Sequence, residues 1–166
     1  MVRKFEKISY EMFKSNIIDL GINTAEEVIA NIYNNIKLPE RKTKFSAGYD
    51  FSLPFAITIM SHECLLIPTG IKVSLNEDEY LAMHVRSSLG IKYGITLANA
   101  TGIIDSDYYN NSNNEGHIYV KLVNNGDSNI SLQAGDAISQ GIISKFYIVD
   151  NEEIIKSERD GGIGST

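Results

Sequence analysis

The chain is poor in the residues that build covalent and metal cross-links. Among its 166 residues it has 1 cysteine, 3 prolines, 3 histidines and no tryptophan. Because a single cysteine cannot close an internal disulfide, we expect Cys64 to be a small core residue rather than a nucleophile or ligand. The histidines His62, His84 and His117 lack metal-ligand spacing, which argues against a histidine metal site.

Positive charge and long apolar runs are also scarce. The chain has 15 Lys and Arg against 21 Asp and Glu, a net charge of -6, which argues against a broad nucleic-acid surface. No apolar stretch is long enough to cross a bilayer, and the mixed sequence after Lys4 and Lys7 does not resemble a secretory signal. We therefore expect a cytoplasmic protein that binds neither nucleic acid nor membrane, and any anionic ligand must be held by a few local cations.

The N-terminal part has helical spacing. With 43% hydrophobic and 22% charged residues, the chain can form a single domain that buries about 70% of its unfolded surface. Ser9 can cap a first helix, which Gly21 ends. The capping-box pattern of residues 24–27 predicts a second helix. We interpret residues 1–37 as an N-terminal helical extension that packs on the following domain.

From residue 38 onward the chain consists of short apolar runs broken by Gly, Pro, Asn and Asp. Regularly spaced short strands predict a mainly β fold of the jelly-roll or barrel kind, over residues 38–150. The expected strands are residues 55–60, 63–67, 70–75, 80–85, 95–98, 117–124, 130–132 and 137–147. The Asn-rich run 110–116 is interpreted as a mobile polar loop, and residues 151–166 as a glycine-rich C-terminal arm.

One apolar stretch, residues 97–108, ends in two carboxylates and a phenol. If its apolar part is a buried strand, period-two geometry places Asp105 and Asp107 on one side and Tyr108 on the other. Such a run can carry chemistry, or it can be an Asp-rich turn that caps a strand. Taken alone, it is more typical of the turn.

Four further motifs place polar groups beside turns. Residues 46–50 put a carboxylate after a glycine, where the backbone can approach a ligand closely. Residues 86–90 set a guanidinium and two hydroxyls at a strand end, as in a phosphate cradle or a helix cap. Gln140 follows a turn that is otherwise that of a plain hairpin. The tail 159–166 joins Arg, Ser and Thr to glycine, as in an arm that orders on polyphosphate or in a frayed terminus.

In this order, the five motifs resemble those of the trimeric deoxyuridine triphosphatase (dUTPase) family. The resemblance covers about residues 38–166 and rests on Ala-Gly-Tyr-Asp, Arg-Ser-Ser-Leu-Gly, Gly-Ile-Ile-Asp-Ser-Asp-Tyr, Gly-Asp-Ala-Ile-Ser-Gln and Gly-Gly-Ile-Gly-Ser-Thr. It implies a jelly-roll-like subunit and a homotrimer with three shared sites. The implied reaction is hydrolysis of dUTP to dUMP and pyrophosphate with Mg²⁺, which limits uracil in DNA and supplies dUMP for thymidylate synthesis.

The resemblance also implies a role for each matching residue. Asp105 would orient the attacking water and contact the sugar 3′-hydroxyl, while Tyr108 packs under deoxyribose and excludes a 2′-hydroxyl. Asn99 would read the uracil edge with its amide. Asp50 and Gln140 would hold the water and the hydrated Mg²⁺, with no direct ligand to the metal. The remaining implied substrate contacts are Arg86, Ser87, Ser88, Gly102, Ile104, Arg159, Ile163, Gly164, Ser165 and Thr166.

The chain departs from the family pattern in four places. Ile163 stands where the family arm usually has Phe, so stacking over the base is lost or supplied by another group. Ala137 replaces a common Arg, which puts one ion pair in doubt. The helices before residue 38 and the run 110–115 are additions whose roles the resemblance does not provide.

Two other functions compete with dUTP hydrolysis. The sister activity, dCTP deamination, uses a Glu between two apolar residues, where this chain has Val120-Lys121-Leu122. A cation cannot replace that general base, so deamination is the weaker reading. The other alternative is a dUTPase-like regulatory protein that binds nucleotide and contacts a partner through the added helices and the Asn-rich loop. Catalysis does not exclude it.

Overall fold

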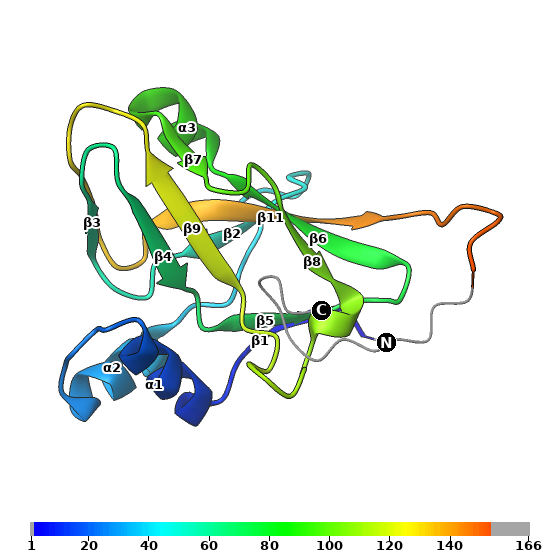
Figure 1. Ribbon diagram of the computed structural model, residues 1–166, viewed down its shortest axis with the longest axis horizontal. Helices are drawn as coiled ribbons and strands as arrows, with labels where there is room; N and C mark the ends of the chain where they lie inside the picture. Colours follow the sequence, from blue (N-terminus) through cyan, green and yellow to red (C-terminus); the bar gives the residue numbers. More distant parts are fainter. Residues whose placement is uncertain (1, 154–166) are drawn as a thin grey trace.

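The computed structural model describes residues 2–153 of the chain (Figure 1). A mainly β domain carries two helices at one end. In chain order the elements are β1 (Lys4–Lys7), α1 (Tyr10–Asp19), α2 (Glu26–Asn35), β2 (Tyr49–Ser52), β3 (Ile57–Ile59), β4 (Cys64–Pro68), β5 (Ile71–Ser74), β6 (Glu79–Val85), α3 (Ser87–Tyr93), β7 (Ile95–Leu97), β8 (Gly102–Asp105), the 3-10 helix η1 (Ser106–Tyr108), β9 (Tyr119–Asn124), β10 (Ile130–Leu132) and β11 (Ala137–Lys145). None of the described helices is long and apolar enough to cross a membrane.

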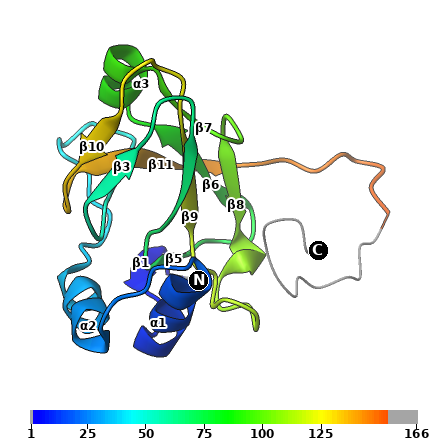
Figure 2. The ribbon, with the colours of Figure 1, turned by 60° about the vertical axis from the view of Figure 1, so that its left-hand side comes forward.

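The strands pair antiparallel in four small sheets. Their orders are β2-β11-β6-β8, β4-β9-β7, β1-β5 and β10-β3. In Figures 1 and 2 the sheet of β4 and β9 lies across the sheet of β6 and β11. The two sheets share one apolar core, to which β6 contributes Leu81 and Met83, and β9 contributes Val120 and Leu122. The prediction of a mainly β fold is confirmed.

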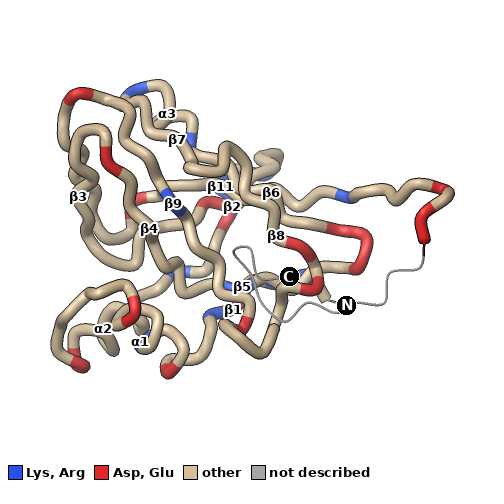
Figure 3. Tube along the Cα trace, viewed as in Figure 1, with Lys and Arg blue, Asp and Glu red and all other residues tan. Residues whose placement is uncertain are grey.

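The first strand corrects the expectation that the whole N-terminal part is helical. Residues 4–7 form β1, which pairs antiparallel with β5 from Lys4 opposite Ser74 to Lys7 opposite Ile71. A four-residue segment is too short to show either a helical or a strand period, so the sequence pattern missed it. Arg3 ion-pairs with the buried Glu79, the first residue of β6, which follows the acidic turn that Figure 3 shows.

The two expected helices are present, with one correction at a cap. The Ser9 hydroxyl accepts from the Met12 N–H as predicted, at 3.2 Å. Helix α2 instead starts after Ala25 and has no side-chain cap, so the predicted capping box is wrong. Phe13 and Ile17 of α1 are fully buried in the same cluster as the β-domain core. The helices therefore pack on the β domain, as expected.

Three local expectations are wrong. Cys64 is exposed at the start of β4, because burial along this strand begins only at Ile67. The period-two placement of Asp107 and Tyr108 fails because the chain leaves β8 after Asp105 and turns into η1. The run 110–116 is ordered by its own side chains, with Asn111 and Asn114 buried and hydrogen-bonded. Strand β2 was also absent from the expected strands.

Candidate active site

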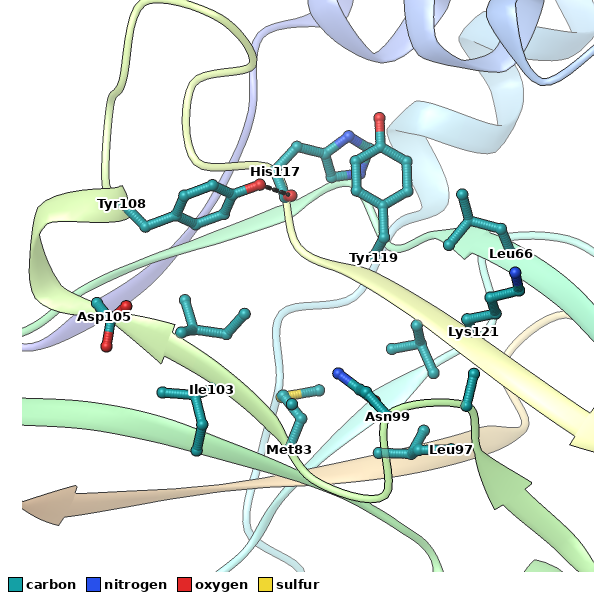
Figure 4. A pocket seen from close by; sticks show the side chains of 14 residues that line it. Leu66, Met83, Leu97, Asn99, Ile103, Asp105, Tyr108, His117, Tyr119 and Lys121 are labelled. Carbon is teal, nitrogen blue, oxygen red and sulfur yellow. Dashed lines mark hydrogen bonds between the residues drawn. The ribbon is translucent and has the colours of Figure 1, made fainter. Parts of the chain in front are cut away.

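A cavity of about 360 Å³ opens between β8, the turn after β7 and β9 (Figure 4). Five residues singled out in the sequence line it, and all of them come from the stretch 97–108: Asn99, Gly102, Ile104, Asp105 and Tyr108. The Asn99 amide reaches into the cavity from the turn, and Asp105 and Tyr108 stand at the end of β8 (Figure 4). The turn after β7, together with β8 and η1, thus brings together an amide, a carboxylate and an aromatic ring.

Two hydrogen bonds hold the Tyr108 ring in the wall of this cavity. Its hydroxyl donates to the His117 carbonyl oxygen at 2.9 Å and accepts from the Asn114 side-chain amide at 2.7 Å. The side chain is buried. Because both roles of the hydroxyl are filled, the ring has a defined position rather than a range of rotamers.

The His117 ring behind Tyr108 is neutral. Burial lowers the pKa of His117 to about 3, although the nearby Glu115 carboxylate acts in the opposite direction. Its Nε2 accepts from the Gly70 N–H at 2.8 Å, so Nδ1 carries the proton and donates to Asn16 Oδ1 at 2.6 Å. Tyr119 packs on the ring, with centroids 4.2 Å apart. A residue of α1 is therefore bonded to the wall of the cavity.

A second group of the predicted residues lies on the four-stranded sheet. Asp50 of β2 is opposite Gln140 of β11, and Arg86 follows the end of β6. Arg86 Nε lies 3.5 Å from Asp50 Oδ1. Asp50 is buried, and its other oxygen, Oδ2, has no hydrogen-bond partner among the described residues. Ser87 and Ser88 form the first turn of α3, directly after Arg86.

A glycine makes room for the Gln140 amide. A Cβ on Gly48 would lie 2.5 Å from Gln140 Oε1, closer than nonbonded atoms approach. Only a residue without a side chain therefore permits this position of Gln140 beside Asp50.

The two groups lie well apart within one chain. Asp105 is opposite Tyr80 on β6, whereas Gln140 is opposite His84 on the same strand. Four residues along a strand span about 13 Å, and β2 and β8 are three strands apart at about 4.8 Å each, so Asp50 and Asp105 are roughly 19 Å apart. A single chain does not bring its cavity and its Asp50 group to one reacting atom.

Some predicted residues lie elsewhere, and some lining residues were not predicted. Arg159, Ile163, Gly164, Ser165 and Thr166 are outside the described residues. Met83, His117, Tyr119 and Lys121 line the cavity, and their sequence contexts are those of ordinary strands. The described residues contain no group of three or more His, Cys, Asp and Glu that could hold a metal ion.

Comparison with known proteins identifies the family to which this chain is similar. Residues 34–166 match the family model described as dUTPase. The chain is 40% identical over 142 residues to the deoxyuridine 5'-triphosphate nucleotidohydrolase of Lactococcus lactis, covering 84% of this chain and 95% of that protein. The Rickettsia prowazekii protein of that name is 36% identical over 156 residues, covering 90% and 97%. The crystal structure of dUTPase from Streptococcus mutans has a TM-score of 0.67 at 35% identity, covering 89% and 98%.

Proposed function

The chain belongs to the dUTPase family, and we propose that its two separated residue groups are the halves of one site for dUTP. The protein is a dUTP diphosphatase, which hydrolyses dUTP to dUMP and pyrophosphate. The proposal that the site has two halves rests on the observation that Asn99, Asp105 and Tyr108 line one cavity.

The cavity suits deoxyuridine. The Asn99 amide offers a donor and an acceptor together, which matches the edge of uracil. The Tyr108 ring packs against deoxyribose. Because its hydroxyl is hydrogen-bonded to both His117 and Asn114, the ring cannot move aside to make room for a 2′-hydroxyl. The Asp105 carboxylate orients the attacking water toward the phosphate and contacts the 3′-hydroxyl.

The Asp50 group suits the phosphates. Arg86 supplies a guanidinium for phosphate oxygens, and Ser87 and Ser88 add hydroxyls beside it. The free Oδ2 of Asp50 fits a carboxylate that accepts from the water shell of Mg²⁺, with the Gln140 amide beside it. When bound, Mg²⁺ would neutralise charge on the phosphates. The chain's own contribution is to hold the water shell and the phosphates in place.

The separation of the halves supports a homotrimer with shared sites. Two groups roughly 19 Å apart in one chain act on one bond only if the cavity of one subunit meets the Asp50 group of another. Ile103 lines the cavity and is 53% exposed, so this rim carries apolar surface that a second copy can cover. A cytoplasmic location fits an enzyme whose substrate is a free nucleotide.

The competing functions receive less support. Lys121, rather than a Glu, lines the cavity at the position where deamination requires a general base. The elements considered as partner contacts are used inside the chain, since Phe13 and Ile17 of α1 and Asn111 and Asn114 of the loop are buried. No described contact favours a regulatory partner over hydrolysis.

Pyrophosphate release from a panel of deoxynucleotides with Mg²⁺ tests the reaction. We expect dUTP to be the preferred substrate, and Asp105→Asn to lower kcat about 10²- to 10⁴-fold while dUTP binding changes little. Asp107→Asn is the matched control, because Asp107 is in the same motif but does not line the cavity. Wild-type protein that leaves dUTP intact would refute the assignment.

Mixed assembly tests the shared site. Subunits with Asp105→Asn and subunits with Arg86→Ala, each inactive alone, should recover part of the activity when they assemble together, because one site in the mixture has both halves intact. Asp105→Asn mixed with Asn99→Ala is the control, since both changes damage the same half. A stable and active monomer in light scattering contradicts the trimer.

A further inference from the structure

The loop of residues 110–116 has an unusual distribution of polarity, with amide side chains on the inside. Asn114 is buried, and its Oδ1 accepts from the Asn111 amide at 2.8 Å and from the Gly116 N–H at 3.0 Å. These bonds hold the loop in shape. The amide nitrogen of Asn114 is directed out of the loop, to the Tyr108 hydroxyl at 2.7 Å.

The same loop is tied to the start of α1. The Glu115 carboxylate accepts from the Ser9 N–H at 2.8 Å and from the Ser9 hydroxyl at 2.5 Å, and Lys72 lies 3.4 Å from it. Ser9 is itself the cap of α1. The residue next to Asn114 therefore joins the loop to the N-terminal helix.

A second tie from α1 reaches the other partner of Tyr108. The Tyr108 hydroxyl donates to the carbonyl oxygen of His117, whose ring is held by Asn16 of α1 at 2.6 Å and by the Gly70 N–H at 2.8 Å. The Asn114 amide and the His117 carbonyl, which these bonds join to the phenol oxygen, are thus connected to α1, one through the loop and one through the histidine.

We propose that Asn114, supported by Asn16, is a positioning residue that holds the Tyr108 ring at the distance from the sugar that separates deoxyribose from ribose. The inference rests on the proposed function of the cavity. A ring whose hydroxyl loses its donor partner can tilt away from C2′, and a shift of about 1 Å makes room for much of an added oxygen. The N-terminal helix and the loop, which the family pattern does not require, then act in sugar selectivity.

The sharpest test is Asn114→Asp. This change keeps Oδ1 and its two bonds within the loop but replaces the amide donor to Tyr108 with a second acceptor. We expect the ratio of kcat/KM for dUTP to that for UTP to fall about threefold to tenfold, the range for one lost hydrogen bond. The fall should come mainly from faster UTP hydrolysis. A purely structural role would lower both substrates alike and leave the ratio unchanged.

Asn113→Asp is the matched control, because it makes the same charge change one residue away at an exposed side chain. If Asn114→Asp does not fold, Tyr108→Phe keeps the ring and removes this bond together with the one to the His117 carbonyl oxygen. It should lower the ratio at least as far as Asn114→Asp, and the double variant should lower it by less than the two single changes added together. A ratio that stays at the wild-type value in these variants overturns the inference.

The contribution of α1 is measured separately. Asn16→Ala removes the acceptor for the His117 ring and should lower the ratio of kcat/KM for dUTP to that for UTP. Asn16→Asp keeps an acceptor and should restore most of the ratio. Ser15→Ala, on the exposed side of α1, should leave the ratio unchanged. A wild-type protein without dUTP hydrolysis would refute the proposed function and this inference together. If the wild-type protein hydrolyses dUTP and all variants keep the wild-type ratio of kcat/KM for dUTP to that for UTP, only this inference is refuted and the proposed function stands.

Discussion

Acid should destabilise the fold through the buried histidine His117. The unfolded chain has a histidine with a pKa of about 6.5, whereas burial lowers the pKa of His117 in the folded chain to about 3. The folded chain holds His117 in its deprotonated, neutral form, so this residue favours folding at high pH. Its contribution is complete above about 6.5 and is lost as the pH falls toward 3, because the unfolded state binds the proton first.

The size of this loss follows from the two pKa values. Linkage gives about 1.4 kcal/mol per pH unit between them, so lowering the pH from 7 to 5 should reduce the free energy of unfolding by about 2 kcal/mol. Glu79 does not interfere in this range. Its pKa is lowered from 4.5 to about 2, chiefly by the bond from Arg3, so its contribution is lost only below about 4.5.

Urea unfolding at pH 7, 6 and 5 measures the effect, at one protein concentration because the proposed homotrimer would contribute to stability. His117→Asn should be less stable at pH 7 and should lose much less on acidification. His62→Asn is the matched control, since the His62 side chain is 65% exposed, and it should keep the wild-type slope. An equal slope in wild type and His117→Asn would show that the buried neutral histidine does not determine acid stability.

Three further predictions concern the ion pair, the Asp50 group and the arm. Arg3→Gln should raise the pKa of Glu79 toward 4.5, lower the stability at neutral pH and reduce the further loss of stability between pH 4.5 and 2, as followed by circular dichroism; an unchanged loss in that range would contradict this. Gly48→Ala should displace the Gln140 amide and lower kcat about tenfold to a hundredfold with the fold intact, whereas full activity would mean that Gln140 is not needed. Ile163→Phe should tighten dUTP binding in titration calorimetry if the arm lacks a stacking partner for uracil, and unchanged binding would mean that another group covers the base.

The β domain was predictable because its strands are bounded by strong turn residues and show regular apolar runs. The eight expected strands all overlap strands of the structure, and Ser9 caps α1 as its hydroxyl chemistry indicates. Short or ambiguous segments were not predictable. Residues 4–7 contain one apolar side chain, Phe5. They acquire their strand conformation from pairing with β5, whose register partners lie 64 to 70 residues away, as Val73 does from Phe5.

The residues of the site were predictable from the sequence, but the hydrogen bonds that hold them in place were not. Asn99, Asp105 and Tyr108 belong to one short stretch, residues 97–108, so their proximity follows from local geometry. The polar interior of the loop was missed because Asn and Ser in sequence are typical of an exposed turn. Asn114 is buried only because Tyr108 and Asn111 satisfy its amide, and such pairing has no signature in composition.

The ties between α1 and the loop also bear on how the chain is synthesised. Asn16 and His117 are 101 residues apart in sequence, and Ser9 and Glu115 are 106 apart. At translation rates of about 5 to 20 residues per second, α1 waits roughly 5 to 20 seconds after it is made before its partners exist. During that interval its apolar face, including Phe13 and Ile17, has no β domain to cover it. Helix α1 is thus made well before the contacts that hold it on the β domain can form.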